Sequence, residues 1–181
     1  MQRIVVGTPG SEQLTLNNQG LLFGFAGDDT LVANWNTNDY YTAFMVGGDG
    51  NDHYHFEGDW GVIVDTLGHD TLTLPGYSSQ YIGAFVNSQD LTLINTATGK
   101  EVFIVDAKSR GRIETYKFES GEVFSVAEVE QWVYEQSYGN ISYAEYNPGL
   151  SAQHFLEVKE INKAWADLDW GSVWQSVVQQ G

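Results

Sequence analysis

A nine-residue pattern rich in glycine and aspartate recurs in the first half of the chain and limits the folds that this half can adopt. The complete copy, residues 47–55, is Gly-Gly-Asp-Gly-Asn-Asp-His-Tyr-His and fits G-G-x-G-x-D-x-U-x, with Tyr54 as the large apolar residue U. Glycine permits positive φ angles and so turns backbone carbonyls towards one point. The short strand after the Asp directs residue U inward. Each copy therefore predicts a tight acidic turn followed by a short strand.

Three weaker copies surround the complete one. Residues 24–32 lack only the second glycine, residues 65–73 keep one glycine, the Asp and the Leu, and residues 7–15 carry Glu12 in place of Asp. The copies begin at positions 7, 24, 47 and 65, which gives steps of 17, 23 and 18 residues. A coil of two strands and two turns built from such nonapeptides returns the chain to the same side after about 18 residues. The spacing therefore predicts a short parallel β-roll with the acidic turns stacked along one edge.

Stacked turns of this kind place carbonyl and carboxylate oxygens side by side, and Ca²⁺ accepts about 6–8 oxygen ligands in loose geometry. We expect one ion between the turns of Asp29 and Asp52 and another between those of Asp52 and Asp70, whereas the longer side chain of Glu12 makes a third ion less favourable. The alternative is a set of ordinary glycine and Asx turns that bind no ion. The predicted metal ligands are Gly24, Ala26, Asp28, Asp29, Gly47, Gly48, Asp49, Gly50, Asn51, Asp52, Asp65 and Asp70.

The distribution of charge supports a search for cations and excludes other partners. The 181 residues include 24 acidic and 8 basic side chains, for a net charge of −16 with neutral His. Residues 1–88 hold eight Asp, two Glu and a single basic side chain, Arg3, so this half repels itself when compact unless cations neutralise it. A nucleic-acid partner is excluded because phosphate requires a basic face. No apolar run approaches the ~20 residues of a membrane span, and the absence of Cys excludes disulfides and thiolate metal sites.

The segment that follows the repeats is predicted to form a cap. Strands are expected at residues 89–96, 101–106 and 113–118, and Ser125 with Glu128 forms a capping box that opens a helix. A roll of short strands leaves unpaired backbone groups at its last coil, and terminal strands cover them. The fold class is therefore mainly β, a short parallel roll capped by antiparallel strands, with C-terminal α-helices. The predicted regions are 1–76 (roll), 77–133 (cap) and 134–181 (helical tail).

The repeats and the cap together resemble the hemolysin-type, or RTX, calcium-binding proteins. The nonapeptide is the calcium repeat of that family, and Ile113-Glu114 with residues 118–123 match its cap pattern position by position. The resemblance covers residues 7–133. It implies a roll that folds on binding Ca²⁺ with the cap as nucleus, export through a type I secretion apparatus, and a secreted, extracellular location.

Three interpretations of the tail stay open. From Ser151 a second helix is expected, with a stripe of apolar residues that suits docking onto the roll. The family resemblance instead implies an uncleaved C-terminal secretion signal. A third interpretation is an amphipathic helix for a partner or membrane surface, which the acidic polar face disfavours.

The sequence predicts a binding module rather than an enzyme. It contains no H-E-x-x-H helix, nucleophile elbow or phosphate-binding glycine loop. His53 and His55 are expected on the outward face of one strand, beside inward Tyr54. Two alternatives to a calcium-binding RTX module remain. One is the non-catalytic C-terminal part of a secreted enzyme or toxin. The other is an adhesin-like module that binds a glycan or peptide through the loop of Trp35, Tyr40 and Tyr41. These three and Trp60 and Tyr77 are read as exposed aromatics that could stack on a ligand, although packing in the core or a loop is the favoured use of such side chains.

Overall fold

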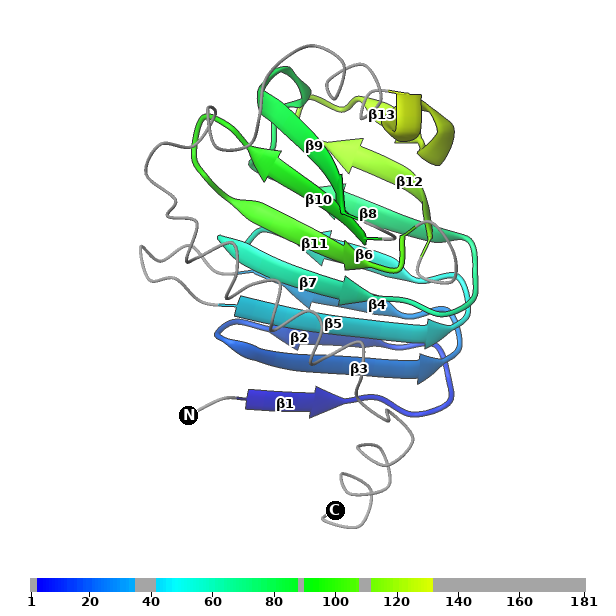
Figure 1. Ribbon diagram of the computed structural model, residues 1–181. Coiled ribbons are helices and arrows are strands. Elements are labelled where there is room, and N and C mark those ends of the chain that lie inside the picture. Colours follow the sequence, from blue (N-terminus) through cyan, green and yellow to red (C-terminus); the bar gives the residue numbers. More distant parts are fainter. Residues whose placement is uncertain (1–2, 35–41, 88–89, 108–111, 132–181) are drawn as a thin grey trace. The chain divides into compact units, whose positions relative to one another are not determined.

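The first eight strands alternate between two stacked, largely parallel sheets, as the roll requires. The computed structural model describes residues 3–34, 42–87, 90–107 and 112–131. One wall of the roll contains β1 (Arg3–Val6), β3 (Gly20–Ala26), β5 (Thr42–Asp49) and β7 (Trp60–Val64). The other wall contains β2 (Gln13–Leu16), β4 (Thr30–Ala33), β6 (His53–Phe56) and β8 (Asp70–Leu74). Figure 1 shows β1 at one end of the stack and the cap strands at the other. The predicted mainly-β class, with a parallel roll of two stacked sheets, is confirmed.

The register of the second wall aligns the U positions of the four repeats. Leu14 pairs with Leu31, Leu31 with Tyr54, and Tyr54 with Leu72, all in parallel. Leu31, Tyr54 and Leu72 are fully buried and Leu14 is 9% exposed. Because strand side chains alternate between faces, this column faces the core while His53 and His55 lie half-buried on the other face, as expected. Burial of this apolar column is the main force that holds the coils in register.

The cap extends both walls of the roll before it closes them. Its elements are η1 (Ser79–Tyr81), β9 (Ile82–Asn87), β10 (Asp90–Asn95), β11 (Glu101–Val105), β12 (Ile113–Phe118) and β13 (Val123–Ser125). Strand β11 pairs in parallel with β7, and β12 pairs in parallel with β8. Antiparallel strands then follow, β10 and β9 on one wall and β13 on the other. The three expected strands are confirmed, whereas β9 and β13 were not predicted.

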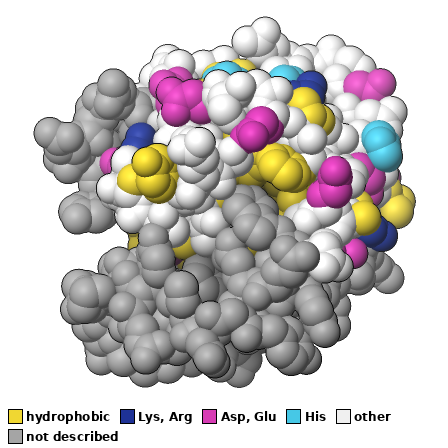
Figure 2. Space-filling model, turned by 90° about the horizontal axis from the view of Figure 1, so that it is seen from above, with side chains coloured by type: hydrophobic (Ala, Val, Ile, Leu, Met, Phe, Trp, Pro, Cys, Tyr) yellow, Lys and Arg dark blue, Asp and Glu magenta, His cyan; other side chains and the backbone are white. Residues whose placement is uncertain are grey.

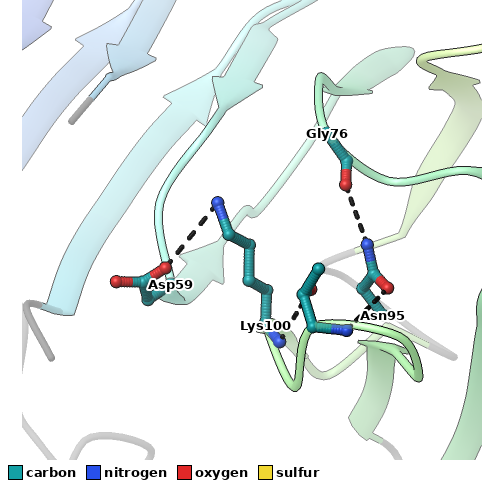
Figure 3. Close-up of polar contacts among 5 residues, drawn as sticks. Asp59, Gly76, Asn95 and Lys100 are labelled. Carbon is teal, nitrogen blue, oxygen red and sulfur yellow. Dashed lines mark hydrogen bonds and ion pairs between the residues drawn. The ribbon is translucent and has the colours of Figure 1, made fainter. Parts of the chain in front are cut away.

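Two polar contacts attach the hairpin between β10 and β11 to the roll (Figure 3). Lys100 Nζ lies 3.6 Å from Asp59 Oδ1, in the turn before β7. The Asn95 amide donates to the Gly76 carbonyl at 2.8 Å, and its Oδ1 accepts the backbone N–H of Ala97 at 3.0 Å. Asn95 is 3% exposed, so these bonds satisfy a buried amide and fix the hairpin after the last repeat.

The predicted capping box is present at the end of β13. The Ser125 N–H and hydroxyl both donate to Glu128 Oε2 at 2.7 Å, and a helix begins at Val126 and continues to Gln131, where the described range ends. The expected tail helices, residues 134–181, and the aromatic loop with Trp35, Tyr40 and Tyr41 lie outside the described residues. Contacts divide the chain into two units, Met1–Gly139 and Asn140–Gly181. No helix in the described part has the length and apolar character needed to cross a membrane.

Candidate metal centre

Three aspartate carboxylates and one glutamate carboxylate from the cap accept backbone N–H groups in a ladder along one edge of the roll. The Glu12 N–H donates to Asp29 Oδ1 at 2.8 Å, and the Asp29 N–H donates to Asp52 Oδ1 at 2.8 Å. The Asp52 N–H donates to Asp70 Oδ1 at 2.7 Å, and the Asp70 N–H donates to Glu114 Oε2 at 2.7 Å. We call these five residues the inner ladder. The acidic turn of each coil therefore donates a backbone N–H to a carboxylate of the next coil or of the cap.

Two oxygens of the inner ladder are buried without a hydrogen-bond partner. Asp29 is 1% exposed and Asp52 2% exposed. In both, Oδ1 accepts a backbone N–H, while Oδ2 has no partner in the described structure. A buried carboxylate oxygen with no donor costs several kcal/mol unless it is protonated or bound to a cation. The inner ladder is thus incomplete as a purely protein structure.

Three buried carboxylates converge at the end of the ladder nearest the cap. Asp52, Asp65 and Asp70, which we call the acid triad, each place one oxygen within 4.8 Å of the others. Their exposed fractions are 2%, 3% and 1%. The fully buried Tyr54 hydroxyl donates to Asp65 Oδ2 and accepts the Gly47 N–H at 3.0 Å. Carboxylate oxygens such as these three are hard donors that Ca²⁺ takes in proteins.

The first glycines of the second and third repeats, Gly24 and Gly47, make room for these carboxylates. A Cβ at Gly47 would lie less than 3.0 Å from both Asp52 Oδ2 and the Tyr54 hydroxyl. A Cβ at Gly24 would lie less than 3.0 Å from Asp29 Oδ2 and from the Gly47 carbonyl oxygen. At each of the two glycines, the place of a Cβ is therefore next to an unpartnered carboxylate oxygen, and a side chain there would collide with it.

A second, exposed set of polar side chains links the same turns. The Asp28 N–H donates to Ser11 Oγ at 3.0 Å, the Asn51 N–H to Asp28 Oδ1 at 2.8 Å, and the His69 N–H to Asn51 Oδ1 at 3.0 Å. We call these four residues the outer ladder. Asp28 and Asn51 thus each accept a backbone N–H with a side-chain oxygen. In Figure 2, which views the molecule from above, carboxylates on the described face are spread singly or in small groups among uncharged side chains, unlike the buried Asp29, Asp52 and Asp70 of the inner ladder.

The predicted ligands fall into four groups. Asp52, Asp65 and Asp70 meet in the acid triad, where an ion was expected between the turns of Asp52 and Asp70. Asp29 belongs to the inner ladder but not to the triad. Asp49 is exposed and its Oδ1 accepts the Thr66 hydroxyl at 3.1 Å. The others line or bridge the turns, and they are Gly24, Ala26, Asp28, Gly47, Gly48, Gly50 and Asn51.

Sequence reasoning missed two polar partners and misplaced one aromatic side chain. Tyr54 was expected only as an apolar U residue, although a hydroxyl at a buried position is a signal for a polar partner. Glu114, part of the matched Ile-Glu pair of the cap, accepts the last backbone N–H of the inner ladder. The expected exposure of Tyr77 is wrong, because this side chain is fully buried, and half-buried Trp60 packs on Phe103 with ring centroids 5.8 Å apart.

Burial makes these carboxylates hard to ionise. Burial raises the pKa of Asp52 to about 7, and the charges of Asp70 and Asp29 add to the effect. Burial likewise raises the pKa of Asp65 to about 7, with the charge of Asp70 adding to it. The pKa of Asp70 rises to about 6, because of burial and then the charge of Glu114. A divalent ion in the triad would remove this cost.

These shifts predict opposite pH dependences with and without metal. The folded pKa values of Asp52, Asp65 and Asp70, about 7, 7 and 6, lie above the unfolded value near 4. In the metal-free protein, the contribution of these groups to the free energy of unfolding is therefore greatest below about pH 4 and is lost as the pH rises to about 7. Protons also compete with the ion, so the rise in melting temperature caused by Ca²⁺ should be small near pH 5 and large near pH 7.5. Melting curves at two Ca²⁺ concentrations that both fold the chain, recorded at both pH values, measure this. A calcium effect that does not grow with pH would contradict it.

No protein-family model matches the chain, and no curated protein matches it either. The family resemblance therefore remains a prediction from the repeat and cap residues.

Proposed function

We propose that this chain is a calcium-binding module of the RTX type, in which ion binding drives folding of the roll. The observation that carries the proposal is the acid triad, in which three buried carboxylates converge and Asp52 Oδ2 has no partner in the described structure. The parallel coils and the two-walled cap support it because they match the architecture that the repeats predict.

The donor set favours Ca²⁺ over other biological cations. The triad offers three carboxylates, and its members include no thiolate and no imidazole. Zn²⁺ sites in proteins are built mainly from Cys and His. Mg²⁺ dehydrates reluctantly and usually keeps several waters, whereas the triad residues are at most 3% exposed. Ca²⁺, which binds in flexible geometry and with fewer retained waters, fits the acid triad better than Mg²⁺ or Zn²⁺ does.

Ion binding supplies enough free energy to decide whether the roll folds. An ion that binds only the folded chain adds RT ln(1 + [L]/Kd), about 2.7 kcal/mol at a hundredfold excess over Kd. Two ions contribute about 5 kcal/mol, which is comparable with the whole stability of a small domain. Without ions, the buried carboxylates repel one another and the glycine-rich turns lose much conformational entropy on folding.

The expected result is a chain that folds only when calcium is present. Far-UV circular dichroism at about pH 7.5 should show little β-structure in EGTA and a cooperative gain of it at millimolar Ca²⁺. Mg²⁺ at the same concentration is the control and should produce much less structure. Equal spectra and equal denaturation midpoints in EGTA and Ca²⁺ would refute the proposal.

The proposal extends to where the module works. A calcium-free chain would stay extended at the low calcium concentration of a cytosol and pass through a type I secretion apparatus, and the higher calcium outside would fold it. This compartment logic rests on the family resemblance, whereas the direction of the calcium effect rests on the buried charges. The module acts by binding, with no catalytic step of its own.

A further inference from the structure

The two positions of the inner ladder that share Asp52 are chemically unequal. Between Asp29 and Asp52, the repeats begin with Gly24 and Gly47, which carry no side chain. Between Asp52 and Asp70, the later repeat begins with Asp65 where the complete copy has Gly47. The second position therefore has a third buried carboxylate, and the first has two.

Tyr54 holds this additional carboxylate in place. The phenol is fully buried, and because its oxygen accepts the Gly47 N–H at 3.0 Å, its proton is directed to Asp65 Oδ2. The other oxygen, Asp65 Oδ1, accepts the N–H of Thr66. A Cβ at Gly47 would crowd both the Tyr54 hydroxyl and Asp52 Oδ2, so the unpartnered oxygen of Asp52 is directed towards the same region as the Tyr54–Asp65 pair.

We infer that Asp65 sets the calcium concentration at which the roll folds, because it makes the acid triad the first ion site to fill, ahead of the position between Asp29 and Asp52. This inference rests on the proposed function and names the residue that tunes it. Oxygen sites for Ca²⁺ gain affinity with the number of charged ligands and with the rigidity of the site. The triad exceeds the neighbouring position in both respects, since it has one more carboxylate and a tyrosine that orients it.

Filling of the triad also prepares the neighbouring position. Asp52 belongs to the triad, and its Oδ1 accepts the N–H of Asp29. An ion at the triad fixes the Asp52 carboxylate and neutralises its charge, so the turn that contains Asp29 then docks on an ordered acceptor. Tyr54 acts here as a positioning residue, because it reaches the ion through Asp65.

Calorimetric titration of the full chain with Ca²⁺ tests the order of filling. Asp65→Asn should raise the Kd of the first ion by about tenfold or more, because one of three charges is lost. Asp29→Asn is the matched control, since Asn keeps an oxygen for the N–H of Glu12. It should leave the first Kd within about twofold and weaken only the later, weaker binding step.

A second variant separates positioning from folding. Tyr54→Phe keeps the buried ring and loses the hydroxyl, and loss of an outer hydrogen bond to a ligand commonly costs about 10- to 100-fold in metal affinity. Circular dichroism at saturating Ca²⁺ shows which variants fold. If Asp65→Asn does not fold, the first Kd of Tyr54→Phe decides, because a shift supports the inference and an unchanged value overturns it.

The inference and the proposed function fail in different ways. Equal weakening by Asp65→Asn and Asp29→Asn, or an unchanged first Kd in Asp65→Asn, overturns the assigned role of Asp65 while calcium binding stands. If the unaltered chain binds no Ca²⁺ at millimolar concentration, the proposed function itself is wrong.

Discussion

Asp52→Asn should remove most of the calcium dependence of folding, because Asp52 borders both expected ion positions. Asn keeps an oxygen that can accept the N–H of Asp29, so the turn retains its hydrogen bond. The charge that faces the ions is lost. We expect the part of the unfolding free energy that depends on calcium to fall from about 5 kcal/mol to ~1 kcal/mol or less. Urea denaturation at a series of Ca²⁺ concentrations that fold each chain, with the free energy extrapolated to zero calcium, measures the difference.

The same substitution should act in the opposite direction without metal. Near neutral pH the unaltered chain must either bury an Asp52 charge or take up a proton there, since burial raises the pKa of this group to about 7. Asn removes that cost, so the metal-free variant should be more stable than the metal-free parent.

Asp90→Asn is the control for both measurements. Asp90 Oδ1 accepts the N–H of Asp106 at 2.8 Å in the cap and belongs to neither ladder. It should therefore leave the calcium dependence unchanged. A calcium effect of full size in Asp52→Asn would show that the ions bind elsewhere.

Gly48→Ala should destabilise the calcium-bound roll by about 4 kcal/mol or more. Gly48 has a φ of +108° and pairs with Phe25 of the neighbouring coil. A Cβ there would lie less than 3.0 Å from the Phe25 carbonyl oxygen, which is backbone. Strands β3 and β5 have neighbours on both sides in their sheet, so neither can move away. Guanidinium denaturation in excess Ca²⁺ measures the loss.

Gly76→Ala separates crowding from backbone conformation. Gly76 also has a positive φ, +78°, but nothing lies within 4 Å of an added Cβ. It should cost only ~1 to 2 kcal/mol, the penalty for a side chain in the left-handed region. Similar losses in the two variants would mean that the close approach between coils matters less than the conformation of the turn.

The roll could be predicted from the sequence because the pattern that specifies each turn and strand is short and recurs along the chain. Steps of 17, 23 and 18 residues returned each acidic turn to one edge, and the U positions aligned Leu31, Tyr54 and Leu72 in the core. Strand β9 carries no repeat, and β10 is its only neighbour among the described strands of its sheet. The repeat pattern therefore gave no signal for it.

The candidate site was predictable in its residues but not in its connections. The pattern identified Asp52 and Asp70 and placed them on adjacent turns. It did not reveal that the Tyr54 hydroxyl bonds Asp65, because a strand pattern gives the direction of a side chain and not its partner across the core. It also could not show which carboxylate oxygens lack partners, since this depends on the exact approach of neighbouring coils.

The two ladders run in opposite senses, and this has a mechanical consequence. At the complete repeat, the N–H of Asn51 reaches back to Asp28 while the N–H of the next residue, Asp52, reaches forward to Asp70. An interior coil is therefore clasped from both sides by adjacent residues of one turn. Removal of a single coil leaves backbone donors and side-chain acceptors without partners on each neighbouring coil. Under mechanical force, the folded roll should thus unfold in one cooperative step rather than coil by coil.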